Sequence, residues 1–202
     1  MLGGFLLEEH SLVTKSARRL QEHCPEGIRD LADDIEPWEG WESDHCDWAE
    51  VAMPAMAAGM ILGDLSVVRA AVASSWPKHE PEPLRDMIND PPIHGMWQAG
   101  SLLINRPISQ AYLDNVLNGR AKRPKLHLAV TNAILAGDEK KTQAGIRKIV
   151  SDQRRYCEKG AYGRPAECRI AMDATVLAIA AIDRGMTLSF SQRVGDHLLL
   201  PD

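Results

Sequence analysis

The side chains that could do chemistry are concentrated in the first fifty residues, where carboxylates, histidines and cysteines lie close together. Asp33-Asp34, and the pair Asp44 and Asp47, offer neighbouring carboxylates of the kind that general acid–base catalysis uses. His45-Cys46-Asp47 and His23-Cys24 contain metal-ligating residue types. Adjacent residues on a helix point in different directions, however, and a dense acidic run produces carboxylate pairs by chance. We therefore expect no catalytic site, no metal and no cofactor.

Nucleophilic and phosphate-binding motifs are also missing from the sequence. There is no G-x-S-x-G, no H-E-x-x-H, no paired C-x-x-C and no glycine-rich phosphate loop. The four cysteines, Cys24, Cys46, Cys157 and Cys168, have no disulfide-framework or metal spacing, and we expect free thiols. The chain is therefore not expected to be an enzyme.

An acidic segment, residues 30–50, contains three tryptophans and no Lys or Arg. Acidic charge steers a basic partner, and Trp is typical of interface hot spots. The alternative is that the tryptophans belong to the core beneath a solvated acidic face, and the sequence favours neither interpretation. The candidate partner-binding residues are Asp33, Asp34, Glu36, Trp38, Glu39, Trp41, Glu42, Asp44 and Asp47.

Charge is distributed unevenly along the chain, although the formal net charge is only −5. Residues 1–50 hold four Lys/Arg and thirteen Asp/Glu, a balance of −9. Residues 119–169 hold thirteen Lys/Arg and five Asp/Glu, a balance of +8. This basic region could follow a phosphate backbone or pair with the acidic region. Because the overall pI of about 5.8 is acidic and no nucleic-acid-reading motif is present, we expect no direct nucleic-acid binding.

The elements that must position these side chains are helices. Aromatic residues are few, and apolar residues recur at helical spacing. The pattern predicts helices over 93–105, 109–117, 124–136, 138–158 and 166–184, and further helices before residue 76. The last is apolar on nearly every side, which is typical of the centre of a bundle. The fold class is all-α: an irregular bundle of about 8–10 helices built from αα-hairpins, with a short extended C-terminal segment over 186–191.

One phrase occurs twice and indicates how the helices are joined. Gly63-Asp64 and Gly137-Asp138 each follow an apolar run, and superimposing them aligns Ala70 with Ala144 and Val72 with Ile146. Glycine can take the left-handed conformation that ends a helix, and aspartate can cap the next helix. The phrase therefore predicts a tight hinge between consecutive helices, used twice.

The length fits a single domain over residues 1–202, with a candidate sub-boundary in the proline-rich stretch 77–92. The N-terminal apolar run is too short for a signal peptide, and no apolar stretch is long enough to span a membrane. We therefore expect a cytoplasmic protein without membrane contact.

The order of elements in the C-terminal half resembles the bacterial immunity proteins grouped as the Imm49 family. The resemblance rests on the hinge Ala133–Asp138, the charged helix after it, the Ala-rich helix ending Asp183-Arg184-Gly185, and the extended, Leu-rich end. It implies a protein that binds and neutralises a polymorphic or type VI secretion toxin, often a nuclease. Neutralisation by binding needs no catalytic residues, and a phosphate-gripping nuclease offers a basic surface to the acidic segment.

Two other functions remain open at this point. The chain could be a helical-repeat-like scaffold that binds cellular proteins. Less favoured is an enzyme whose unrecognised site would combine carboxylates of the acidic segment with His45.

Overall fold

The computed structural model describes residues 91–158, 170–198 and Leu200, together with Arg18, Arg19, Glu22, Leu65, Ser66 and Arg69. The chain divides into two compact units, Met1–Met87 with Pro201 and Ile88–Leu200 with Asp202. The dividing point lies within the stretch 77–92, and the single-domain interpretation stays a prediction. In the first unit, Ser66 and Arg69 are helical, whereas Gly63-Asp64 lies outside the described residues.

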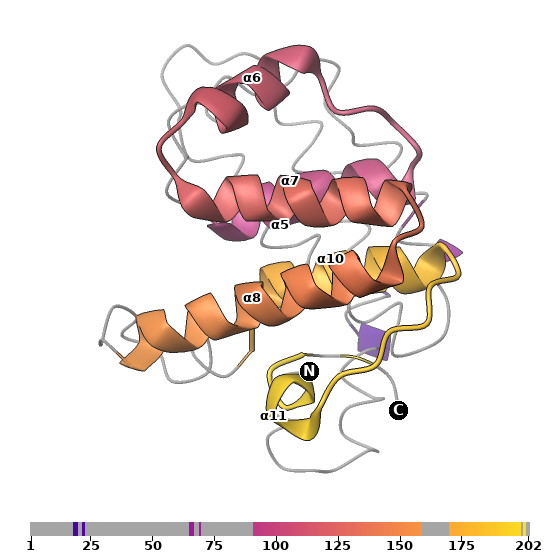
Figure 1. Cartoon of the computed structure of the whole chain (residues 1–202). Coiled ribbons are helices and arrows are strands. Elements are labelled where there is room, and N and C mark those ends of the chain that lie inside the picture. The colour runs from indigo at the N-terminus through magenta and orange to yellow at the C-terminus, as the bar shows by residue number, and fades with distance from the viewer. Residues whose placement is uncertain are drawn as a thin grey trace. The chain divides into compact units, whose positions relative to one another are not determined.

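The second unit is built from helices, which confirms the all-α class; none of the residues that the structure describes forms a strand. The helices are α5 (Pro91–Leu103), α6 (Gln110–Asn118), α7 (Lys122–Leu135), α8 (Glu139–Glu158), α10 (Met172–Asp183) and α11 (Gln192–Gly195). Figure 1 shows α7 and α8 in front, with α5 behind α7 and α10 behind α8. None of the described helices meets the length and hydropathy that a membrane crossing would require.

The second Gly-Asp hinge has the structure predicted for it. Gly137 has a φ of +68°, in the left-handed region that glycine adopts without strain. Its N–H donates to Ile134 O and the Asp138 N–H donates to Ala133 O, so α7 ends in a Schellman motif. The Asp138 carboxylate then accepts from the Lys141 N–H at 3.0 Å and caps α8. This turn makes α7 and α8 an antiparallel hairpin.

Helix α10 is the core helix, as its sequence predicts. Val176, Leu177 and Ile179 are fully buried, and α10 packs most extensively on α5. It ends at a second left-handed glycine, Gly185 with a φ of +84°. The predicted start at residue 166 is wrong at the described positions, because Ile170 and Ala171 precede the helix. The N–H of Ala171 instead donates to His197 O, which ties the start of α10 to the C-terminal segment.

Two glycines let helices approach closely. A Cβ added at Gly95 of α5 would lie 2.6 Å from Asp173 Cβ of α10, and one added at Gly145 of α8 would overlap Val130 of α7. Real Cβ atoms do not approach so closely, so both helix pairs depend on glycine at the crossing. The α5–α10 contact therefore brings the backbone of α5 directly against Asp173.

Residues 186–190 form neither helix nor strand and contact α8, and the expected extended conformation stays a prediction. The Thr187 N–H donates to Glu139 Oε1 at 2.8 Å, and Arg147 Nη2 donates to Ser189 O at 3.1 Å. The chain then forms the short helix α11, which the sequence pattern did not predict, and Leu198 is buried. The Leu-rich end therefore packs against other residues at Leu198.

Candidate functional site

The acidic segment lies outside the described residues. All nine candidate partner-binding residues belong to it: Asp33, Asp34, Glu36, Trp38, Glu39, Trp41, Glu42, Asp44 and Asp47. The metal-ligating types at His23, Cys24, His45 and Cys46 lie outside as well. These assignments stay predictions. The site chemistry that the structure describes belongs to the second unit.

A cluster of paired side chains in that unit is centred on Asp173, in the first turn of α10. Arg123 of α7 donates from Nε to Asp173 Oδ2 at 2.9 Å and from Nη2 to Asp173 Oδ1 at 3.0 Å, which makes a bidentate ion pair. His127, one turn further along α7, has its Nε2 2.8 Å from the same Oδ2. Arg123 also donates to Gln153 Oε1 of α8 at 3.2 Å. One cluster thus joins α7, α8 and α10.

The charge of this cluster is fixed by its burial and its pairing. The side chains of Arg123 and Asp173 are 12% and 3% exposed. Burial alone would raise the pKa of Asp173, but the hydrogen bond and charge of His127, and then those of Arg123, lower that pKa from 3.8 to about 2. Asp173 therefore stays ionised at neutral pH and does not act as a proton donor.

A second buried network joins α5, α6 and α7. Tyr112 Oη of α6 accepts from Gln98 Nε2 at 3.0 Å and lies 2.8 Å from His94 Nδ1. Thr131 of α7 donates to Gln98 Oε1 at 2.7 Å. All four residues are buried. Because buried polar groups cost free energy unless they are paired, these bonds select one arrangement of the three helices.

Neither network is arranged for catalysis. His127 and Asp173 resemble the histidine–carboxylate half of a catalytic triad, but His127 is fully buried and its Nδ1 has no hydrogen-bond partner. A substrate has no access to a fully buried ring. Within the described ranges no group of three His, Cys, Asp or Glu residues could hold a metal ion. Cys157 on α8 is part-buried, and the other three cysteines lie outside the described residues.

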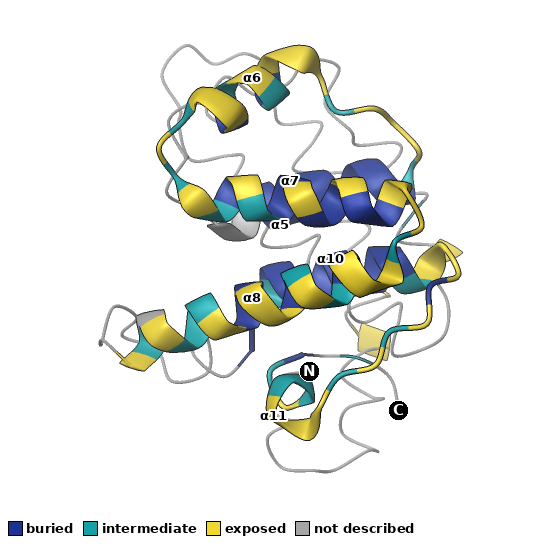
Figure 2. Ribbon diagram, viewed as in Figure 1, coloured by how far each residue is buried: buried dark blue, intermediate teal, exposed yellow. Residues whose placement is uncertain are grey.

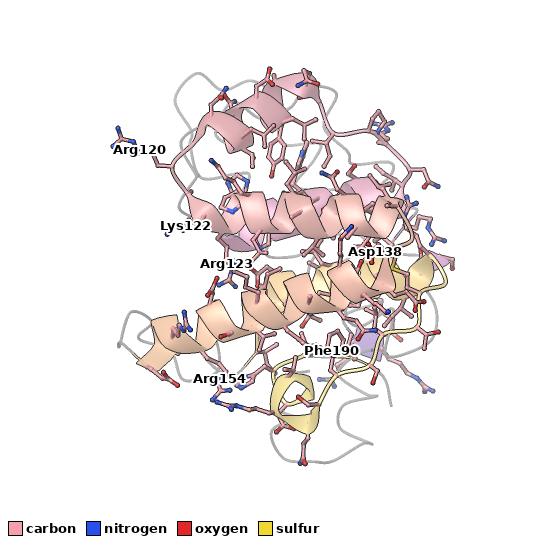
Figure 3. All side chains as sticks on the ribbon, viewed as in Figure 1. Arg120, Lys122, Arg123, Asp138, Arg154 and Phe190 are labelled. Carbon is pink, nitrogen blue, oxygen red and sulfur yellow. The ribbon has the colours of Figure 1, made fainter. Side chains whose placement is uncertain are left out.

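Most cations of the basic region lie on the surface instead. Figure 2 shows that α8 is buried along one side and exposed along the other, and Figure 3 places Arg123 between α7 and α8 while Arg120 points away from the helices. The exposed cations of this region are Arg120, Lys122, Lys125, Lys140, Lys141, Arg147, Lys148 and Arg155. The region therefore separates into one buried, paired arginine and many solvent-facing cations.

The sequence analysis missed the Asp173 cluster, although a signal for it was present. Asp173 is an acidic residue within an otherwise apolar helix, and an Asp in such a place is rarely buried without a partner. Arg123 and His127 are four residues apart, so they share one face of α7. The sequence does not show that Asp173 pairs with Arg123 and His127, because they lie about fifty residues apart.

Comparisons with protein-family models, curated proteins and solved structures gave no match for this chain.

Proposed function

We propose that this protein is a bacterial immunity protein that binds and neutralises a cognate toxin, a secreted nuclease, by protein–protein contact. The observation that carries the proposal is that the Asp173 cluster is buried and has no access for a substrate. The one histidine–carboxylate pair of the described residues, His127 with Asp173, is buried and holds helices together. In the part of the chain that the structure describes, this reactive pair holds helices together, which favours a protein that acts through its surface.

The elements behind the family resemblance support the proposal. The Gly137-Asp138 hinge joins a helix to a charged helix, and Gly185 ends an apolar core helix before a non-helical segment. These are the features in the C-terminal half on which the resemblance to immunity proteins rests. They form a rigid frame, which lowers the entropic cost of presenting a binding surface.

The surface proposed for the toxin is the acidic segment, residues 30–50. A nuclease must attract phosphates, so its substrate-binding surface is positive. The acidic segment has the complementary sign, and Trp38 and Trp41 would supply apolar anchoring area. The toxin meets such a protein inside the producing cell, so we place the immunity protein in the cytoplasm, within a type VI or polymorphic toxin system.

Growth rescue tests the proposal. The full chain is co-expressed with the product of a neighbouring gene that stops growth when expressed alone, and the complex is recovered by pull-down. We expect restored growth and a stable complex. Toxicity that persists while the full chain is well expressed, with no complex recovered, would contradict the immunity function.

Charge neutralisation tests the surface. The variant Glu36→Gln/Glu39→Gln/Glu42→Gln/Asp44→Asn should weaken toxin binding by about tenfold or more, mainly through slower association. The matched control neutralises four carboxylates of the second unit: Asp114→Asn/Asp152→Asn/Glu158→Gln/Asp196→Asn. Equal affinities for the two variants would remove the acidic segment from the proposal and leave the immunity function standing on the rescue assay.

A further inference from the structure

The charges on the outer side of α8 are predominantly positive. Between its terminal residues Glu139 and Glu158, the helix has six cations and a single acid, Asp152. With 3.6 residues per turn, the small residues Ala144 and Ser151 fall along the middle of the exposed side, and the cations fall on both flanks of that line. The six cations, here called the cationic face, are Lys140, Lys141, Arg147, Lys148, Arg154 and Arg155.

The cationic face is largely unneutralised. Lys141 pairs with Asp138 at 3.0 Å, and it is the one member of the face with an ion pair among the described residues. Arg147 Nη2 donates to two uncharged oxygens, Gln143 Oε1 and Ser189 O. A helix face that is merely solvated usually alternates acids and bases at spacings of three and four residues, which stabilises the helix. Here the Asp138–Lys141 pair is the one such ion pair that the described residues form.

The start of α7 continues the cationic face. The hydrogen bond from Arg123 to Gln153 places the first turn of α7 beside the last turns of α8. Lys122 and Lys125 lie in that first turn and are exposed, and Figure 3 shows Arg120 extending outward just before it. Cations are unfavourable at a helix N-terminus, where the helix dipole is positive. Their position there does not serve helix stability.

The composition of the face identifies its partner class. Protein interfaces are depleted in lysine, whereas half of these six cations are lysines. The distance from Lys140 to Arg155 is about 22 Å along the helix axis, which matches a stretch of duplex carrying roughly a dozen phosphates.

We propose that the cationic face binds the phosphate backbone of double-stranded nucleic acid without reading its sequence. This goes beyond the proposed immunity function and replaces the sequence-based expectation of no direct nucleic-acid contact. That expectation rested on the acidic pI of the whole chain and on the missing nucleic-acid-reading motif, and binding to the phosphate backbone alone needs no such motif. Because salt screens charges beyond about 8–10 Å, a polyanion at α8 responds to the local cations more than to the net charge.

Fluorescence anisotropy with a labelled duplex of about 24 base pairs tests the proposal, at roughly 50 to 300 mM NaCl. The full chain should bind, with an affinity that falls steeply as salt rises. The variant Lys148→Gln/Arg155→Gln should bind about tenfold or more weakly at the lowest salt, and the slope of log K against log [salt] should fall by about 2. The matched control is Arg106→Gln/Arg193→Gln, which removes two exposed arginines from outside α7 and α8.

The outcomes separate duplex binding from its alternatives. Binding by the control that equals the parent, with weak binding by the α8 variant, supports the proposal. No anisotropy change for the parent at the lowest salt would overturn it, as would equal losses in both variants. A poly-glutamate peptide that competes as well as unlabelled duplex would show that the face takes acidic protein, and this would also overturn it. None of these results bears on toxin neutralisation.

Discussion

Arg123 and Arg155 are the same residue type on neighbouring helices, and the protein uses them in opposite ways. Arg123 lies inside. Its Nε and Nη2 both donate to the Asp173 carboxylate, and Nη2 also donates to Gln153. Arg155 lies outside on α8 and makes no ion pair with another described residue. Burial makes a charge costly unless it is paired, whereas an exposed charge costs little and is available to a partner. The comparison indicates that buried charges stabilise the packing of the helices, whereas exposed charges are available to bind a partner.

Removing the inner charge should have the largest effect. Asp173→Asn leaves the Arg123 guanidinium largely buried without a carboxylate, which should lower the free energy of unfolding by about 3–5 kcal/mol. Urea unfolding near neutral pH measures it. The matched control is Asp138→Asn, because the Asp138 side chain is 32% exposed, its partner Lys141 is exposed, and asparagine also caps helices; it should leave stability nearly unchanged. Similar losses in the two variants would break the comparison.

Lowering the pH should remove part of the stabilisation that Asp173 provides. The pKa of Asp173 is about 2 in the folded protein, below the 3.8 of an unperturbed carboxyl. Asp173 therefore stabilises the fold fully above about pH 4, and this contribution of about 2 kcal/mol is lost as the pH falls from 4 towards 2. The stability difference between the parent and Asp173→Asn should shrink by that amount over this range. A difference that stays constant would mean that Asp173 is not held ionised by Arg123 and His127.

Close packing around the inner cluster should give a smaller effect. Gly95→Ala places a Cβ 2.6 Å from Asp173 Cβ, and the resulting overpacking costs roughly 1–3 kcal/mol. Alanine is the better helix former by about 1 kcal/mol, so the net loss should be about 1 kcal/mol. Gly195→Ala is the control, since nothing lies within 4 Å of its added Cβ. Thermal unfolding that ranks both variants equal would contradict the close α5–α10 contact.

The sequence predicted the helical frame well because its signals are local. The periodic apolar pattern over 93–105 and 138–158 predicts α5 and α8 to within two residues, and Gly137-Asp138 predicts the turn before α8. The helix α11 was missed because four residues are too few to show a period. The pairing of Arg123 with Asp173 was missed because it is a tertiary contact across fifty residues, which no local pattern contains.

The same difference between local patterns and tertiary contacts applies to the candidate sites. The charge of residues 119–169 was evident from the sequence, but the sequence could not show which cations are paired inside. The structure shows that Arg123 is largely buried and joins helices, whereas Lys148 and Arg155 are exposed members of the cationic face. The acidic segment, residues 30–50, lies outside the described residues, and its part in toxin binding stays a prediction.

Urea unfolding of Lys148→Gln/Arg155→Gln beside Asp173→Asn is the most direct test of the division between inner and outer charges. The account predicts that the outer variant unfolds at nearly the same urea concentration as the parent, because exposed charges contribute little to stability, while the inner variant unfolds much earlier. An outer variant destabilised as much as Asp173→Asn would contradict the account, because it would mean that the exposed cations also hold the frame.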